Sequence, residues 1–279
     1  MNAILKSFMV AAALTITVQA ASKPKLPEVL NIAYSSQDDG CHINTIEHFK
    51  AAVEAGFNCL KTDMQRTSDG VVVLCHDAGF TIDGDGRIGK FDKKNNTPIP
   101  EMSFKDIRKL EYASGKAEKG GFPKVCTLEE FVAFCREAGV WMYITQRNNK
   151  DIDATQAELK RILKKYRMEK KCIVNNYPAN TGTCRKIHEY LPKVPVCFTM
   201  TPESPLTKEK VNEIARLAPV LICLNTRNIP TLEPEVAAYA ASKGIKLLGW
   251  FPKTAGEYSD WKARGLTGAQ ITKRDVIQP

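Results

Sequence analysis

Short runs of β-branched and other apolar residues alternate along the chain with longer stretches whose apolar positions recur at helical spacing. The eight strand-like runs lie at residues 29–34, 59–64, 141–146, 172–177, 194–200, 220–225, 245–251 and 268–272. The helix-like stretches lie at residues 45–56, 127–139, 154–166, 180–191, 207–218, 233–244 and 255–265. Strands that alternate with helices predict parallel strands joined by crossover connections.

The ends of the predicted helices support this division. Thr127 and Thr207 are residue types that cap helix N-termini, and Gly139 and Gly265 stand where a left-handed residue ends a helix. Eight such units predict an α/β fold, a closed (β/α)8 barrel of the TIM type, with functional residues at the C-terminal ends of its strands. A doubly wound open sheet is the alternative, but no glycine-rich dinucleotide loop follows the first strand.

Two features interrupt the alternation. The Asp-Gly turn signal within Thr67 to Gly70 predicts that residues 71–77 fold back on the second strand as a β-hairpin. Residues 78–126 consist mainly of polar turns. We therefore expect one barrel domain over residues 21–279, with an insertion at about 78–126 that lies over the C-terminal mouth.

The first twenty residues have the composition of a secretory signal peptide. Lys6 precedes an apolar run from Phe8 to Val18, and a small-residue pattern ends at Ala20. This predicts a signal peptide over residues 1–20 and an exported, soluble protein, periplasmic or extracellular. No later stretch approaches the roughly 20 apolar residues of a membrane-spanning helix.

Charge and cysteine content narrow the classes of partner. The chain has 40 Lys and Arg residues against 31 Asp and Glu, a formal net charge of +9 that favours anionic ligands. The densest basic run, residues 161–171, has helical apolar spacing and only one aromatic residue, too few for the aromatic interleaving that stacks on bases, so we expect no nucleic-acid partner. The nine cysteines show no zinc or redox spacing, and most fall in apolar runs, which favours core packing.

From about Leu30 to Val276 the chain resembles the glycerophosphodiester phosphodiesterases, barrel enzymes related to the phosphatidylinositol phospholipases. The resemblance is carried by "NTIEHFKAAVEAGFNCLKTDMQRTSDGVVVLCHD" (44–77), "KVCTLEEFVAFCREAGVWMYI" (124–144), "GIKLLGWF" (244–251) and "RGLTGAQITKRD" (264–275). It implies a barrel that hydrolyses glycerophosphodiesters. It also implies a divalent cation, Ca or Mg, held by three carboxylates, with two histidines as general acid and base.

The chain departs from the family pattern at the site itself. The His-Arg-Gly of the first strand corresponds to Tyr34-Ser35-Ser36, so one histidine is absent, and the Glu-x-Asp of the second strand corresponds to Lys61-Thr62-Asp63. The hairpin His-Asp is intact as His76-Asp77. On the third strand Glu-x-Lys corresponds to Thr145-Gln146-Arg147, which keeps only the cation. Two of the three metal carboxylates are therefore missing.

These substitutions predict a site without a metal ion or other cofactor. A lone carboxylate beside an ammonium group repels a divalent cation, because like charges ~4 Å apart oppose each other by several kcal/mol at an intermediate dielectric. We expect Lys61 to occupy the cation's place and pair with Asp63, and Arg147 to bind phosphate. His76 is then the remaining candidate proton donor.

Each candidate residue also has a structural interpretation. Lys61 and Asp63 can form a buried ion pair with no catalytic role, and His76 can be a structural histidine beside its neighbouring aspartate. Tyr34 and Trp250 are candidate ligand contacts from the first and seventh strands, but ordinary packing explains either one. His42 is a possible substitute for the missing histidine, although loop histidines more often lie at the surface.

Two functions remain open at this point. The first is an exported phosphodiesterase acting on glycerophosphodiesters, in which Lys61 and Arg147 stabilise phosphoryl charge and His76 acts as acid. The second is a non-catalytic barrel that binds a small anionic or phosphorylated ligand, because a fold does not by itself confer activity. The sequence leaves the ligand, the oligomeric state and the disulfide pattern open.

Overall fold

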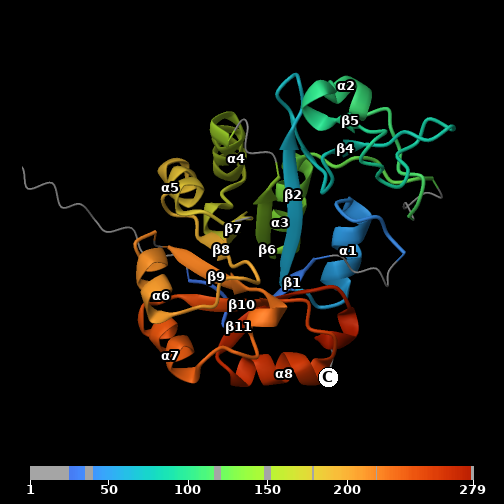
Figure 1. Ribbon diagram of the computed structural model, residues 1–279. Helices are drawn as coiled ribbons and strands as arrows, with labels where there is room; N and C mark the ends of the chain where they lie inside the picture. The colour runs from blue at the N-terminus through green and yellow to red at the C-terminus, as the bar shows by residue number, and fades with distance from the viewer. Residues whose placement is uncertain are drawn as a thin grey trace, which may run out of the picture.

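A computed structural model describes residues 25–34, 40–115, 121–147, 152–177, 179–217 and 219–277, so the predicted signal peptide lies outside the described residues. Within these ranges eight parallel strands surround one axis (Figure 1). They are β1 (Leu30–Ala33), β2 (Cys59–Arg66), β6 (Trp141–Gln146), β7 (Cys172–Asn176), β8 (Val196–Thr199), β9 (Val220–Leu224), β10 (Lys246–Trp250) and β11 (Leu266–Ile271).

The pairing of β1 decides the architecture. β1 pairs in parallel with β11, where Leu30 lies opposite Gly268, and also with β2, where Ile32 lies opposite Cys59. Each remaining strand pairs with its neighbours in chain order. The sheet therefore closes on itself, which confirms the predicted TIM-type barrel and excludes the open doubly wound sheet.

Helices cover the outside of the barrel, as Figure 1 shows. They are α1 (Ile46–Glu54), α3 (Leu128–Ala138), α4 (Ile152–Tyr166), α5 (Thr181–Tyr190), α6 (Lys208–Ala215), α7 (Pro234–Ser242) and α8 (Ala255–Ala263). The short helix α2 (Phe104–Ile107) and the 3₁₀ turn η2 (Ile99–Glu101) belong to the insertion, and further 3₁₀ turns are η4 (Glu169–Lys171), η5 (Thr226–Asn228) and η6 (Arg274–Val276). α3 illustrates how sequence sets the ends: Thr127 and Glu130 form a reciprocal capping box, and Gly139 ends the helix at φ 72°.

Side chains alternate between the two faces of each strand, and this alternation fills the barrel. Inward-facing residues near the N-terminal ends of the strands form a closed apolar cluster, which we call the floor; it includes Ile32, Cys59, Ile173, Leu221 and Leu248. Outward-facing residues pack under the helices in a second, larger cluster. Cysteine side chains lie in both clusters, as the core-packing prediction expected.

The predicted hairpin is present. β3 (Val72–Leu74) pairs antiparallel with the end of β2, and the chain then forms a two-stranded sheet of β4 (Gly79–Phe80) and β5 (Thr97–Pro98). These segments share a small apolar cluster that joins Val73 of the hairpin to Ile99 and Tyr112. Figure 1 shows this insertion beside the C-terminal end of β2.

No helix among the described residues is both long enough and apolar enough to cross a membrane.

Candidate functional site

A cavity of about 290 Å³ opens at the C-terminal ends of the strands. Its lining contains the six residues that the sequence singled out as candidate ligand, ion-pair or acid groups, together with further polar and aromatic side chains. The lining residues are Tyr34, Lys61, Asp63, His76, Thr145, Arg147, Asn175, Tyr177, Trp250, Phe251 and Gln270. We call this cavity the mouth pocket.

Period-two alternation along the strands explains why these residues meet. In β2 the floor residue Cys59 is followed at two-residue steps by Lys61 and Asp63, both of which face inward. β6 repeats the pattern, since Tyr143 faces the floor and Arg147 lies four positions further on. The mouth pocket is therefore the continuation of the inward face that forms the floor.

A buried ion pair stands at the base of the mouth pocket. Lys61 Nζ donates a hydrogen bond to Asp63 Oδ2, and the two side chains are 5% and 1% exposed. Arg147 Nε lies 3.9 Å from the other carboxylate oxygen, Asp63 Oδ1, and its side chain is 30% exposed. Asp63 Oδ1 is buried and accepts no hydrogen bond from any described residue. One carboxylate thus faces two cations, only one of which reaches solvent.

Burial acts strongly on the ionisable groups here. It lowers the pKa of Lys61, and the neighbouring Asp63 carboxylate opposes that effect by stabilising the ammonium form. The Lys61 ammonium also lies 4.2 Å from the centroid of the Tyr34 ring, a cation–π contact. Burial, with the charge of Asp63 second, raises the pKa of Tyr34 to about 12. The Tyr34 phenol is therefore protonated at neutral pH and can act as a hydrogen-bond donor.

Tyr34, His76 and Asp77 form a chain of polar contacts. The Tyr34 hydroxyl lies 3.4 Å from His76 Nε2, and His76 Nδ1 lies 3.1 Å from Asp77 Oδ1. The hydrogen bond with His76 lowers the pKa of the Asp77 carboxyl. Arg147 Nε also donates to the His76 carbonyl oxygen over 3.0 Å. Asp77 can thus orient the imidazole, leaving Nε2 directed towards the mouth pocket.

Aromatic rings form one wall of the mouth pocket. Trp250 and Phe251 stack with centroids 5.9 Å apart, and Tyr34 and Tyr177 meet this pair edge-on at 4.7 and 5.3 Å. Trp250 Nε1 is buried and has no hydrogen-bond acceptor among the described residues. Phe251 has φ 54°, a left-handed conformation that is costly for a bulky side chain and is typical of functional sites.

Hydrogen bonds between buried polar side chains link the strands that carry the site. Asn44 accepts a hydrogen bond from Thr62 at 2.8 Å, which fixes the loop before α1 against β2. Asn175 donates to Thr145 at 3.0 Å and accepts from Thr199 at 2.7 Å, so three neighbouring strands are linked at one level. Buried polar groups that are paired in this way hold a site rigid.

The residues present do not fit a divalent cation. In the described ranges no group of three His, Cys, Asp or Glu side chains is placed to share an ion, and Asp63 is the one carboxylate that lines the mouth pocket. A cation at Asp63 would lie beside both the Lys61 ammonium and the Arg147 guanidinium. The ion pair described above already supplies positive charge at that place.

His42 does not replace the missing histidine in this arrangement. Its ring stacks on Tyr112 with centroids 3.6 Å apart, Nδ1 lies 2.8 Å from the Ile43 carbonyl oxygen, and burial lowers its pKa. It lines a separate small cavity, to which His76 and Asp77 also contribute. Ser35 and Ser36, which correspond to the Arg-Gly of the family motif, lie outside the described residues.

Gln270, Tyr177 and Phe251 line the mouth pocket although sequence reasoning gave them no role. Gln270 and Tyr177 are the inward-facing positions at the ends of β11 and β7, and the period-two rule with strand length could have found them. Phe251 follows the inward-facing Trp250, so alternation places it on the outer face. Its left-handed backbone turns it into the mouth pocket instead, and no local residue preference signals that.

Comparison with known proteins gives a consistent result. Residues 38–271 match the model of the glycerophosphoryl diester phosphodiesterase family. The human glycerophosphodiester phosphodiesterase 1 is 31% identical over 137 residues, which cover 48% of this chain but only 36% of the human protein. A glycerophosphodiester phosphodiesterase of Caldanaerobacter subterraneus is 22% identical over 80% of this chain and 85% of its own.

Solved structures share the fold. The glycerophosphodiester phosphodiesterase of Thermotoga maritima superposes with a TM-score of 0.66 and 20% identity, covering 90% of this chain and 97% of its own. An Oleispira antarctica phosphodiesterase, solved with its product sn-glycerol-3-phosphate, gives a TM-score of 0.70 at 14% identity over 88% and 94% of the two chains. With the family match over most of its length, the chain belongs to the glycerophosphoryl diester phosphodiesterase family.

Proposed function

We propose that this family member binds the phosphate of a glycerophosphodiester in the mouth pocket through protein cations, and that the metal-dependent hydrolysis typical of the family is impaired. The observation that carries the proposal is the Lys61 ammonium seated on Asp63, with Arg147 3.9 Å from the other carboxylate oxygen. Lys61, Asp63 and Arg147 together sum to one positive charge. An anion is the ligand that such a site attracts.

The donors around the pocket suit a phosphate group. Arg147 brings a planar guanidinium that matches phosphate oxygens in pairs, and its side chain reaches solvent. The Tyr34 hydroxyl stays protonated at neutral pH, and Trp250 Nε1 is a buried donor that lacks an acceptor among the described residues. A bound phosphate would satisfy that donor, and buried polar groups are rarely left unsatisfied.

The acceptors suit a hydroxylated alcohol such as glycerol. Asp63 Oδ1 is buried, accepts no hydrogen bond from a described residue, and faces the same cavity as the aromatic wall. A glycerol hydroxyl could donate to it while the carbon atoms pack against Trp250. The related Oleispira antarctica phosphodiesterase was solved with sn-glycerol-3-phosphate, a ligand with this combination of groups.

A second candidate function is slow phosphodiester hydrolysis without a metal ion. The contacts from Tyr34 through His76 to Asp77 favour it, because they orient His76 Nε2 at the pocket. A protonated His76 would give its proton to the departing alkoxide while Lys61 and Arg147 stabilise the phosphoryl charge. The attacking water would lack a second histidine as base, which is why we expect the rate to be low.

Calorimetric titration of sn-glycerol 3-phosphate in the presence of a chelator tests the binding proposal. We expect saturable binding that Arg147→Ala weakens about 10-fold or more, the usual value of a charged hydrogen bond to phosphate. Arg136→Ala, at the end of α3 and outside the mouth pocket, is the matched control and should bind normally. No binding to the wild-type protein would refute the proposal.

An assay of product release from glycerophosphodiesters separates the two candidates. Release in the presence of chelator, abolished by His76→Ala, would establish the metal-independent hydrolase. Binding of sn-glycerol 3-phosphate without any release would leave the non-catalytic binding function. Release that depends on added calcium or magnesium and is lost in Asp63→Asn would contradict both.

The remaining sequence-based expectations belong to the same proposal. Export to the periplasm or the extracellular space rests on the signal-like residues 1–20. A small phosphodiester or anionic ligand, with no nucleic-acid partner, rests on the narrow, largely buried cation site and on the basic run of residues 161–171, whose single aromatic residue, Tyr166, does not form the interleaved aromatic pattern that stacks on bases. Cleavage of the leader, mapped by N-terminal sequencing of the secreted protein, checks the first of these.

A further inference from the structure

A second cavity, of about 590 Å³, adjoins the mouth pocket on the side of the insertion. Its lining residues come from the end of β2, the hairpin and the segment after it, β5, η2, the end of β6 and α4. They are Gln65, Arg66, Thr67, Ser68, His76, Ala78, Pro98, Pro100, Glu101, Arg147 and Thr155. His76 and Arg147 line both cavities, so the two spaces meet at these side chains. We call the second cavity the insertion groove.

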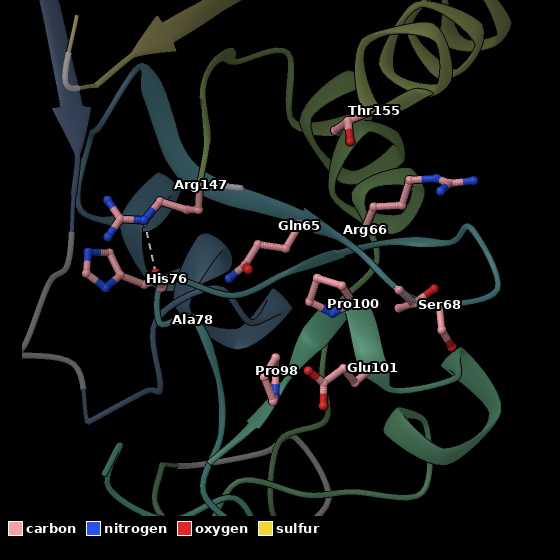
Figure 2. Close-up of a pocket in the computed structure, with 11 residues that line it drawn as sticks. Gln65, Arg66, Ser68, His76, Ala78, Pro98, Pro100, Glu101, Arg147 and Thr155 are labelled. Carbon is pink, nitrogen blue, oxygen red and sulfur yellow. Dashed lines mark hydrogen bonds between the residues drawn. The ribbon is translucent and has the colours of Figure 1, made fainter. Parts of the chain in front are cut away.

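Figure 2 shows the arrangement of the insertion groove. Arg147 and His76 lie together at one end, joined by the hydrogen bond from the guanidinium to the His76 carbonyl oxygen. Ser68 lies at the other end, and Pro98, Pro100 and Glu101 flank the space between. A phosphate held by Arg147 would therefore stand at the junction, with one ester arm in each cavity.

The wall formed by η2 is fixed to the hairpin. The Ser68 amide donates to the Met102 carbonyl oxygen at 2.9 Å, and the Ile99 amide donates to the Ala78 carbonyl oxygen at 3.3 Å. The Ile99 side chain is fully buried in the cluster under the hairpin. The Asp69 carboxylate also accepts from the Phe104 amide at 3.0 Å. Backbone bonds on both sides of the groove make it a built cavity rather than a gap between loops.

The side chains open to the groove are suited to hydroxyl groups. The Ser68 hydroxyl and the Glu101 carboxylate are exposed and make no hydrogen bond with another residue in the described part of the chain. The rings of Pro98 and Pro100 supply an apolar surface next to them. A polyhydroxylated alcohol combines hydroxyl donors with a C–H face, which is the complement of such a lining.

The relative volumes of the two cavities also favour a larger alcohol in the insertion groove. The mouth pocket, at about 290 Å³, suffices for a phosphate and a three-carbon alcohol, and the insertion groove has about twice that volume. We propose that the insertion groove binds the second alcohol of the diester, and that this alcohol is a cyclic polyol or sugar. The inference rests on the proposed phosphate binding at Arg147.

Calorimetric titration in chelator with three ligands tests this inference. The first ligand, sn-glycerol 3-phosphate, has no second alcohol on its phosphate. Glycerophosphoinositol carries a polyol as the second alcohol, and glycerophosphocholine carries a cationic one. We expect glycerophosphoinositol to bind about 10-fold more tightly than either of the others. Glu101→Ala and Ala78→Trp, which remove an acceptor and fill the groove, should each abolish this advantage and leave the affinity for sn-glycerol 3-phosphate unchanged.

The possible outcomes separate this inference from the proposed function. Equal affinity for sn-glycerol 3-phosphate and glycerophosphoinositol would overturn the inference and leave the phosphate site standing. Tighter binding of glycerophosphocholine, lost in Glu101→Gln, would assign the groove to a cationic arm and overturn the polyol inference. If sn-glycerol 3-phosphate fails to bind, both the proposed phosphate site and the polyol inference are refuted. Lys105→Ala, on α2 beyond the groove, is the control variant and should bind all three ligands normally.

Discussion

The floor and the mouth of the barrel are built by the same strands and carry opposite chemistry. At the floor the inward-facing residues, such as Ile173 and Leu221, are apolar and fully buried. A few residues further along, the inward face carries the Lys61 and Asp63 ion pair and Arg147. The floor stabilises the fold by excluding water, whereas the mouth keeps charges whose burial costs stability.

This difference shows where a barrel tolerates change. Replacing a residue at the floor alters the volume of a closely packed interior, which is felt directly as lost stability. Replacing a donor at the mouth alters charge and hydrogen bonding while leaving the strands in register. A chain can therefore retain the barrel of a phosphodiesterase family and present a different set of charges at its site.

The largest expected effect comes from removing the cation of the buried pair. Lys61→Met leaves Asp63 as a buried charge without its hydrogen-bonded cation and with only the partly exposed Arg147 guanidinium 3.9 Å away, so we expect a loss of roughly 3–5 kcal/mol in the free energy of unfolding. Urea denaturation measures it. The double variant Lys61→Met with Asp63→Leu should recover most of that loss, because it removes both charges. A stable single variant would contradict the ion-pair assignment.

At the floor, truncation should reduce stability and leave binding intact. Leu221 is fully buried among apolar neighbours, so Leu221→Ala should cost roughly 2–5 kcal/mol in the free energy of unfolding through lost burial and a cavity. Calorimetry at a temperature where the variant is folded should give an unchanged affinity for sn-glycerol 3-phosphate. A large change in affinity would show that floor and mouth are not separable.

The pH dependence of binding should report Lys61. Burial lowers its pKa below the usual 10.5, so phosphate affinity should fall as pH rises through that lowered value. Stability should change in the opposite direction: between the lowered pKa and 10.5 the unfolded chain binds more protons, so the free energy of unfolding rises with pH. Tyr34, with a pKa of about 12, titrates above this window.

Lys61→Arg is the matched variant, since arginine keeps its charge throughout that range. Its phosphate affinity should stay constant to higher pH than that of the wild-type protein. Identical alkaline profiles for the two proteins would show that another group controls binding.

The smallest expected effect on stability is at Asp77. Its contact with His76 joins side chains that are 44% and 32% exposed, so Asp77→Asn should change the free energy of unfolding by less than about 1 kcal/mol. If His76 acts as a proton donor, the same change should still lower the chelator-resistant release of product, because it removes the group that orients the imidazole. Release that persists unaltered would assign Asp77 no positioning role.

Much of the fold could be predicted from sequence because strand and helix periodicities are local signals. The second strand, for example, was expected at 59–64 and occurs as β2 over Cys59–Arg66. Its alternation also places Lys61 and Asp63 on one face. The insertion groove could not be predicted, because it depends on how η2 docks on the hairpin through backbone hydrogen bonds. The position of Phe251 in the mouth pocket could not be predicted either, because its left-handed backbone, with φ 54°, reverses the alternation of side chains along the strand.

The central claim, that the Lys61 ammonium stands where the family holds a divalent ion, is tested most directly by titrating calcium and magnesium into the protein calorimetrically. The account predicts no saturable binding to the wild-type chain and a new site in the double variant Lys61→Glu with Thr145→Glu, which restores carboxylates beside Asp63. Stoichiometric metal binding by the wild-type protein, lost in Asp63→Asn, would contradict it.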